Sequence, residues 1–376
     1  MADPTIASLT LTHARVTPAS VWSFVTLTLD DGTAGVGEAS LMRGPSTLDA
    51  PFRAARSALV GAGLRTALAW PRDDPGLPIA TAAVASAVEQ AAQDAAARRD
   101  RESVANRLGA ARDCVVPLYA NINRRTRDRS PAGFATSARD ALAAGYTAVK
   151  IAPFDDVTPD NAAGADGRRL TAIGLARVAA TFDVLAPGQE LFVDCHWRFP
   201  PALAADVGDA LAERGVTWFE CPIAEGMEAI PDLKRIRARA NARGMRLAGL
   251  EELPAPSAFR PFIDAGAYDI VMPDVKYAGG VGGILAIAAA ARAHGIACAP
   301  HNPTGPVCHA ASLAACAIAT LPLLEHQFDE TPLFFMLAGG SLPRPASGAS
   351  VLPSGTGFGI GLDTGVLPPD AVAVVN

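Results

Sequence analysis

The chain has 376 residues, half of them hydrophobic, and a net charge of −6, so it can bury more than one core. Without a basic stripe, this acidic balance argues against a nucleic-acid partner. No run reaches the roughly 18 apolar residues of a membrane-spanning helix. Six scattered cysteines without CxxC spacing, and no signal peptide, predict a reduced, cytoplasmic protein.

Residues 1–112 predict an α+β capping domain, because they lack the strand–helix rhythm of the later chain. Its expected strands and helices cover 6–16, 21–29, 34–38, 48–60 and 81–108. The loops 17–21 and 41–46 are candidates for covering a neighbouring site. Trp22 and Arg43 are candidate specificity residues, although Trp22 equally suits a core and Arg43 a solvated position.

Residues 113–335 alternate short apolar strands with helices, and seven successive strands run into a polar residue. These residues are Lys150, Asp194, Glu220, Glu251, Asp274, His301 and Glu325. From Asp194 onward they are 26, 31, 23, 27 and 24 residues apart, close to the roughly 30 residues of one unit of a (β/α)8 barrel. A single aspartate after a strand is equally well a helix cap, but the repeated pattern predicts a TIM barrel with its active site at the C-terminal ends of the strands.

The remaining elements complete this expected α/β architecture. The predicted barrel helices cover 132–144, 170–184, 202–214, 228–242, 258–265, 283–294 and 307–319. The Gly/Pro-rich tail, 336–376, is expected to return to the capping domain.

Three consecutive strands end in the carboxylates Asp194, Glu220 and Glu251. Converging carboxylates repel one another, and Mg²⁺ with its preference for oxygen ligands relieves that repulsion. Lys150 adds a further positive charge. Glu252 follows Glu251 and is expected to point to the other face, so it is left out of the metal site.

The next two strands end in Asp274 and His301, a carboxylate and an imidazole that form a candidate general base. A structural His–Asp pair is the alternative. His196, two residues after Asp194, is expected on the same side of its strand. It either donates a proton to a leaving group or hydrogen-bonds to Glu220. The other four histidines lie outside this pattern and suit structural positions.

Together these groups suit one reaction. The metal binds a substrate carboxylate, and His301 removes the α-proton. The enediolate is stabilised by Mg²⁺ and Lys150. His196 then protonates a departing β-hydroxyl, which leaves a 2-keto-3-deoxy acid.

Six motifs, in this order and spacing, resemble the enolase superfamily in its mandelate racemase-like branch. They are Ala148-Val149-Lys150, Val193-Asp194-Cys195-His196, Phe219-Glu220-Cys221-Pro222, Leu250-Glu251-Glu252-Leu253, Pro273-Asp274-Val275 with Gly279-Gly280, and Ala299-Pro300-His301. The resemblance implies a TIM barrel with a capping domain completed by the tail, a small carboxylate substrate and a homo-oligomer. It also implies Mg²⁺ ligands at Asp194, Glu220 and Glu251, a base formed by Asp274 and His301, and a substrate-binding Glu325.

The offset of His196 from Asp194, and the run from His301 to Pro306, are similar to acid-sugar dehydratases of the galactonate dehydratase type. One departure is Ala152, which stands where this branch often has the second lysine of Lys-x-Lys. It disfavours a racemase with two opposed bases and a cycloisomerase that uses that lysine.

Two other interpretations stay open. One is an epimerase or isomerase that uses His301 with Lys150 or Lys276 as a second acid. The other is a non-catalytic barrel that binds a metal. Neither Arg198 nor the long segment 151–189 indicates a particular substrate.

Overall fold

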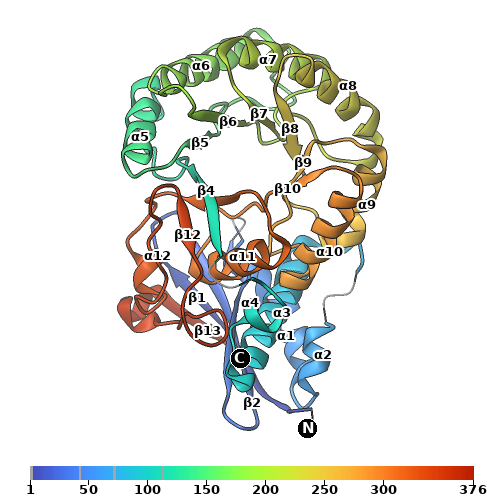
Figure 1. Ribbon diagram of the computed structural model, residues 1–376, viewed down its shortest axis with the longest axis vertical. Coiled ribbons are helices and arrows are strands. Elements are labelled where there is room, and N and C mark those ends of the chain that lie inside the picture. The colour runs from blue at the N-terminus through green and yellow to red at the C-terminus, as the bar shows by residue number, and fades with distance from the viewer. Residues whose placement is uncertain (1–2, 42–43, 71–72, 112–113) are drawn as a thin grey trace.

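The N-terminal part is an antiparallel sheet covered by helices, seen in Figure 1 below the barrel. The structure, a computed structural model, describes residues 3–41, 44–70, 73–111 and 114–376. The sheet is built from β1 (Ile6–Arg15), β2 (Val21–Leu29), β3 (Ala34–Glu38) and β13 (Val372–Val375), in the order β13-β1-β2-β3. Its helices are η1 (Pro45–Leu48), α1 (Asp49–Leu59), α2 (Leu64–Leu68), α3 (Ile79–Asp100) and α4 (Val104–Arg107).

The long helix α3 packs closely on β3 because two glycines of the strand face alanines of the helix. A Cβ atom on Gly37 would lie 2.0 Å from the backbone oxygen of Ala87, and one on Gly35 would lie 2.1 Å from that of Ala91. The small residues therefore set how near α3 comes to the end of β3, where Glu38 lies.

The rest of the chain forms a curled parallel sheet surrounded by helices. Its strands are β4 (Val115–Asn121), β5 (Ala148–Ile151), β6 (Glu190–Asp194), β7 (Trp218–Glu220), β8 (Arg246–Gly249), β9 (Ile270–Val271), β10 (Ala297–Cys298) and β11 (Leu324–Gln327). Each pairs with its neighbour in the order β10-β9-β8-β7-β6-β5-β4-β11, and β12 (Ala349–Val351) adds antiparallel to β4. At the seam, the backbone N–H of Glu325 donates to the oxygen of Pro300 at 3.4 Å.

Helices lie outside this sheet, and Figure 1 shows α5 to α8 as an arc around strands β5 to β8. They are α5 (Pro131–Ala143), α6 (Ala165–Phe182), α7 (Pro201–Arg214), η2 (Met227–Ala229), α8 (Ile230–Asn241), α9 (Ala255–Ala265), α10 (Gly280–Ala293), α11 (Pro306–Ala319), α12 (Leu333–Met336), η3 (Thr364–Val366) and η4 (Pro369–Ala371).

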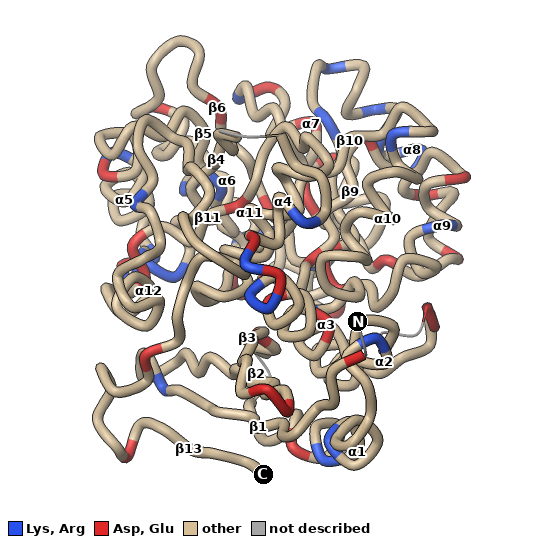
Figure 2. The backbone as a smooth tube through the Cα atoms, turned by 60° about the horizontal axis from the view of Figure 1, so that its bottom comes forward, with Lys and Arg blue, Asp and Glu red and all other residues tan. Residues whose placement is uncertain are grey.

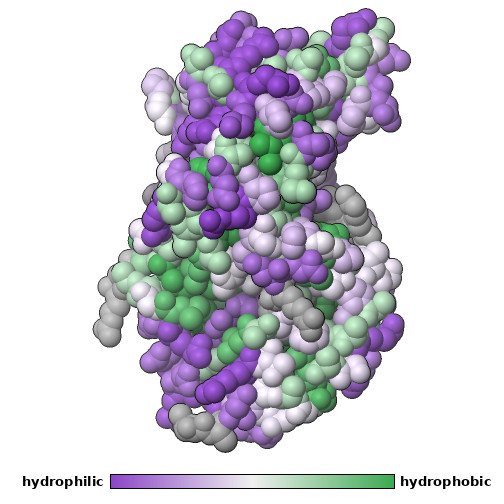
Figure 3. All heavy atoms as spheres, turned by 90° about the vertical axis from the view of Figure 1, so that its right-hand side faces the viewer, coloured by the Kyte–Doolittle hydropathy of each residue, from purple (hydrophilic) through white to green (hydrophobic). Residues whose placement is uncertain are grey.

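Basic and acidic residues both occur along the outer helices (Figure 2). The face in Figure 3 is mainly hydrophilic over the barrel. Among the described residues, no helix combines the length and apolar character needed to span a bilayer.

An apolar layer inside the barrel supports the polar strand ends. Ala148, Phe192 and Trp218 lie two residues before Lys150, Asp194 and Glu220, on the same side of each strand. The rings of Phe192 and Trp218 stack with centroids 4.6 Å apart. This layer closes the inside of the barrel directly beneath the charged residues.

The fold confirms the sequence prediction of a TIM-type barrel with an α+β cap, and most elements agree within a few residues. The predicted helix 81–108 is wrong at its end, because Arg101 has φ +58° and a separate α4 begins beyond it. Helix α6 begins at Ala165 rather than Leu170. The tail reaches the capping sheet through β13, but β12 pairs with the barrel. The boundaries at 112/113 and 335/336 stay predictions, and 112–113 lie outside the described residues.

Candidate active site

A cavity of about 860 Å³ lies between the capping domain and the C-terminal ends of the barrel strands. The cap contributes residues 17–22, Ser40 and Leu41, which confirms the expected placement of loop 17–21. Of loop 41–46, Leu41 lines the cavity, and residues 42–43 lie outside the described residues. Trp22 both lines the cavity and is buried, so the two interpretations of this residue are compatible. Arg43 lies outside the described residues.

The predicted site residues divide into two groups. Asp194, His196, Glu251 and His301 line the cavity, whereas Lys150, Glu220, Asp274 and Glu325 are buried behind its surface. All eight lie at the same end of the barrel, as the repeated strand-end pattern predicts.

Lys150 is the central buried cation. Its Nζ lies 2.5 Å from Oε1 of Glu220 and 2.9 Å from Oε1 of Glu325. Burial by itself lowers the pKa of Lys150, but these carboxylates raise it well above its ordinary value. Burial raises the pKa of Glu220 to about 7 although Lys150 opposes this. Lys150 therefore stays charged and holds the two carboxylates together.

Asp194 and His196 are joined by a turn and not by strand geometry. Strand β6 ends at Asp194, and His196 has φ +46°, in the left-handed region. Its backbone N–H donates to Oδ1 of Asp194 at 2.9 Å, and its Nε2 lies 2.7 Å from Oδ2. The two side chains do lie together, as predicted, but a turn brings them together and not the alternation of a strand. Burial lowers and Asp194 raises the pKa of His196, and the net shift is upward.

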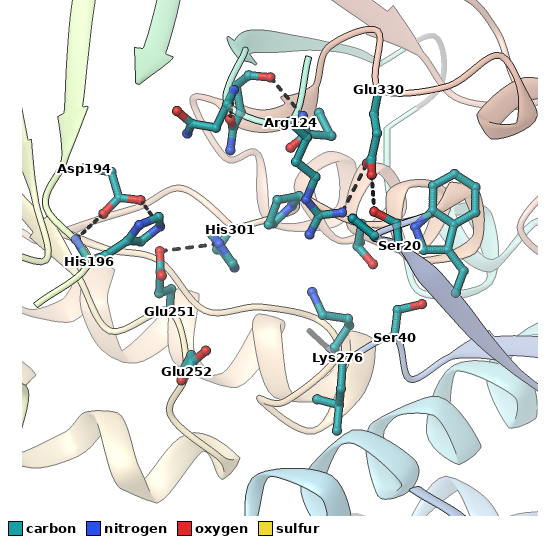
Figure 4. Close-up of a pocket in the computed structure, with 18 of the residues that line it drawn as sticks. Ser20, Ser40, Arg124, Asp194, His196, Glu251, Glu252, Lys276, His301 and Glu330 are labelled. Atoms are coloured by element: carbon teal, nitrogen blue, oxygen red, sulfur yellow. Dashed lines mark hydrogen bonds and ion pairs between the residues drawn. The ribbon is translucent and has the colours of Figure 1, made fainter. Parts of the chain in front are cut away.

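Glu251 lies close to both Asp194 and His301. Its Oε2 is buried without a hydrogen-bond donor and lies 3.4 Å from Nε2 of His301 (Figure 4). Burial, followed by the charges of Asp194 and Glu220, raises the pKa of Glu251 well above its ordinary value. Such an oxygen is costly unless something binds it, and a hard divalent cation fits that requirement.

The candidate ligand atoms of Asp194, His196 and Glu251 lie within 4.8 Å of one another. Glu220 is turned elsewhere, since its oxygens accept from Nζ of Lys150 and, at 2.8 Å, from Nε1 of Trp218. The two carboxylates of this cluster suit Mg²⁺ better than the imidazole does. The ligand set with Glu220 as its third member stays a prediction.

Strand alternation predicted that Glu252 points away from the site, and this prediction is wrong. It lines the same cavity as Glu251, because β8 ends at Gly249 and Leu250 has φ +74°.

Asp274 and His301 form a directly bonded pair, which we call the dyad. Nδ1 of His301 lies 2.8 Å from Oδ2 of Asp274. Nζ of Lys276 binds the same oxygen at 2.5 Å, and the backbone N–H of Lys276 donates to Oδ1 at 2.8 Å. Burial raises the pKa of Asp274, but Lys276 and His301 bring it below its ordinary value. The ring of His301 is thereby oriented with Nε2 toward Glu251 and the cavity.

The sequence suggested Lys276 only as a possible second acid of an epimerase, and not as a partner of Asp274, although its position two residues after Asp274 is a visible signal. Glu330 was missed altogether, because it follows β11 in an irregular segment. Its Oε1 accepts from Oγ of Ser20 at 2.5 Å and its Oε2 from Arg124 at 3.1 Å, which joins cap and barrel across the cavity (Figure 4). Arg198 also lines the cavity, and its guanidinium donates to the oxygen of Val157 at 2.6 Å.

Comparisons with known proteins agree with this architecture. Residues 133–366 match the family described as enolase C-terminal domain-like. D-gluconate dehydratase of Thermoproteus tenax is 27% identical over 275 residues, which are 68% of this chain and 52% of the relative. D-gluconate/D-galactonate dehydratase of Picrophilus torridus is 31% identical over 247 residues, which are 65% of this chain and 60% of that relative. The chain thus spans about half to three fifths of the length of these curated relatives.

Solved structures extend the likeness over nearly the whole chain. An enolase protein from Sargasso Sea environmental sequencing has a TM-score of 0.81 and 27% identity, and the match covers 99% of this chain and 98% of the other. A mandelate racemase/muconate lactonizing enzyme-like protein from Roseovarius sp. TM1035 shares the fold, with a TM-score of 0.84, 23% identity and coverage of 96% and 94%. The chain therefore belongs to the enolase C-terminal domain-like family, which confirms the resemblance to the enolase superfamily that its motifs indicated.

Proposed function

We propose that the protein is a Mg²⁺-dependent dehydratase of a sugar acid or a related α-hydroxy acid. The observation that carries this proposal is the cavity between the dyad and the cluster of Asp194, His196 and Glu251. The cavity is lined by the oriented imidazole of His301, by His196 and by Glu251, whose Oε2 has no hydrogen-bond donor. The names of the sugar-acid dehydratases among the relatives support the substrate class.

Asp194 and Glu251, with Glu220 as the predicted third ligand, would hold the cation, which supplies positive charge to the substrate carboxylate when bound. The orphaned Oε2 of Glu251 supports this assignment.

His301 takes the α-proton of the substrate at Nε2. Its Nδ1 is bonded to Asp274, so Nε2 faces the cavity and Oε2 of Glu251. Asp274 stabilises the imidazolium that forms. Lys150 lies behind the cavity and keeps Glu220 and Glu325 together. Its positive charge stabilises the negative charge that develops on the substrate.

His196 gives a proton to the β-hydroxyl as the carbon–oxygen bond breaks. Its side chain is 40% exposed and borders the cavity, so it is accessible to a substrate. Water leaves, the electrons of the broken C–H bond form the double bond, and the enol tautomerises to a 2-keto-3-deoxy acid.

The test uses D-gluconate and D-galactonate with Mg²⁺ in deuterated water. His301→Asn is expected to abolish both exchange of the α-proton and formation of the keto acid. His196→Asn is expected to retain exchange and to lower the rate of elimination by about 10²-fold to 10⁴-fold, the usual range for a general acid. Elimination at the parental rate in His196→Asn would show that this histidine is not the acid.

An epimerase is the second candidate, and Lys276 is the observation that favours it. Its Nζ is bound to the dyad, and the residue lines the cavity. Solvent deuterium at an inverted centre of recovered substrate, without any keto acid, would identify that reaction.

A further inference from the structure

Glu38, the last residue of β3 in the capping domain, reaches the segment that follows His301. It is fully buried. Its Oε1 accepts from Oγ1 of Thr304 and from the backbone N–H of Gly305, both at 2.8 Å. Its Oε2 accepts from the backbone N–H of Cys308 at 2.9 Å. The carboxylate therefore lies at the N-terminus of α11, where it satisfies donors that the helix leaves free.

A second buried carboxylate of the cap does the same for the segment that follows Asp274. Glu89 lies on α3, and its Oε2 accepts from the backbone N–H of Val281 at 2.9 Å. Its Oε1 accepts from the backbone N–H of Gly282 at 3.2 Å. These are the first residues of α10, so each half of the dyad is followed by a helix whose first turn is bound by the cap.

Gln90 connects the two contacts. Its Nε2 donates to the backbone oxygens of Glu38 at 3.3 Å and of Val275 at 3.2 Å. Its Oε1 accepts from the backbone N–H of Glu38 at 3.1 Å. One side chain of α3 therefore joins the end of β3 to the residue directly after Asp274.

Two glycines of the sequence motifs make this close approach possible. Gly280 has φ +70°, and a Cβ atom there would lie 2.0 Å from Oε2 of Glu89. A Cβ atom on Gly305 would lie 2.6 Å from Oε1 of Glu38. The glycines therefore leave room for the two carboxylates of the cap.

The dyad needs such support because regular sheet pairing ends before it. Strand β9 ends at Val271 and β10 at Cys298, so Asp274 and His301 each lie three residues beyond a strand. The segments that follow them are held by turns and by neighbouring elements, among them Glu325 of β11 and the cap residues Glu38, Glu89 and Gln90.

We propose that Glu38, Glu89 and Gln90 are positioning residues for the dyad. The capping domain then acts on the reaction in two places: loop 17–22 covers the cavity, and β3 with α3 fixes the base from behind. This inference rests on the proposed function and deepens it, because it assigns to the cap the orientation of the base.

The main test compares Glu38→Gln with a matched control, Asp94→Asn. Asp94, on α3, is a buried carboxylate like Glu38 and also accepts from two backbone N–H groups, those of Val36 at 3.0 Å and Phe358 at 2.7 Å, besides Nε of Arg98 at 2.9 Å. Its contacts hold α3 to β3 and to the tail and do not reach the segments of the dyad. Both variants lose stability, but the positioning role predicts that they differ at His301.

The first readout is the Nδ1–H proton signal of His301, seen by NMR in ¹⁵N-histidine-labelled full-length protein and assigned with His301→Asn. We expect Glu38→Gln to lose or broaden this signal and Asp94→Asn to keep it. The second readout is α-proton exchange of D-gluconate or D-galactonate. Here Glu38→Gln is expected to lower kcat by 10-fold to 10²-fold with KM within about twofold, since small misplacements of a catalytic group cost about that much.

An unchanged His301 signal and unchanged kcat in Glu38→Gln would overturn the proposal, as would equal losses in both variants at equal stability. If Glu38→Gln fails to fold, Glu89→Gln keeps one carbonyl acceptor and is tested in the same way. If the wild type exchanges neither acid, the proposed function fails for these substrates, while the NMR comparison still decides the positioning role. The rise in melting temperature on adding Mg²⁺ is expected to persist in Glu38→Gln, because Glu38 bonds to Thr304, Gly305 and Cys308 and not to the candidate ligands Asp194 and Glu251.

Discussion

The residues of the site are buried charges, and nearly every one has a partner. Lys150 shows how strongly the pairs depend on each other, since it is fully buried between Glu220 and Glu325. Removing one member of such a group leaves uncompensated charge in a medium of low polarity, which costs more than the pair itself contributes.

Lys150→Met is therefore expected to lower the free energy of unfolding by about 3 kcal/mol or more. Urea denaturation monitored by circular dichroism measures the loss. Lys234→Met is the control, because Lys234 is an exposed lysine of α8, and it is expected to change stability by less than about 0.5 kcal/mol. Equal effects of the two substitutions would contradict the assigned role of Lys150.

At this scale the sequence predicted best those residues that follow a strand at a regular interval. Asp274 and His301 were recognised because two polar residues ended neighbouring strands, and the structure shows them bonded. Glu38 and Glu330 carried no such signal. Their contacts join segments far apart in the chain, and nothing in a local pattern indicates a partner more than two hundred residues away.

Among the elements, α10 shows how a helix start is adapted to the cap. Gly280 combines a left-handed backbone with direct contact to Glu89. Gly295, just beyond the same helix, is also left-handed at φ +68° but has nothing within 4 Å of an added Cβ atom. The two positions separate backbone strain from the steric effect of the contact.

Gly295→Ala is expected to lower stability by about 1–2 kcal/mol, the cost of placing alanine in the left-handed region. Gly280→Ala is expected to cost at least about 1 kcal/mol more, because the methyl group meets the Glu89 carboxylate. Denaturant unfolding of both variants measures the difference. Equal losses would mean that the carboxylate moves aside freely and does not depend on the glycine.

Element prediction succeeded where periodicity was strong and failed where single residues interrupt it. The strands of the cap and the barrel helices followed their patterns closely. The break after α3 depends on the left-handed Arg101, and the turn at His196 depends on φ +46°. Neither residue is a glycine, so the sequence did not indicate a left-handed backbone at either position. Local hydrogen bonds accompany both. The backbone N–H of Glu102 donates to the oxygen of Ala97 at 2.9 Å around Arg101, and His196 makes two bonds to Asp194.

For the whole molecule, the site belongs to both parts of the fold, and a ligand at their junction should stabilise the whole. The site formed by Asp194 and Glu251 exists only in the folded chain. Mg²⁺ is therefore expected to raise the melting temperature in a concentration-dependent way. The free energy of unfolding is expected to rise by about 2.7 kcal/mol when the Mg²⁺ concentration is 100 times the dissociation constant. Glu251→Gln should abolish the rise, and calorimetry with and without Mg²⁺ measures it. A rise of the same size in Glu251→Gln would place the cation elsewhere.

The contact between cap and barrel also makes stability depend on pH through Glu89. Burial raises the pKa of Glu89 to about 7 although Gln93 and the backbone donors of α10 oppose this. The folded protein therefore binds more protons than the unfolded chain between about pH 4.5 and 7, so its stability falls as pH rises through that window. With 1.36 kcal/mol for each pKa unit, the full change is on the order of 3 kcal/mol.

Glu89→Gln removes this titration. The free energy of unfolding of the wild type minus that of Glu89→Gln is expected to be largest near pH 5 and to fall steadily toward pH 8. Urea unfolding at steps of half a pH unit, in metal-free buffer at constant ionic strength, measures it. Subtracting the variant cancels the other acids, since both proteins share them. A difference that does not change with pH would show that Glu89 is ionised throughout, held by the donors of α10 strongly enough to overcome its burial.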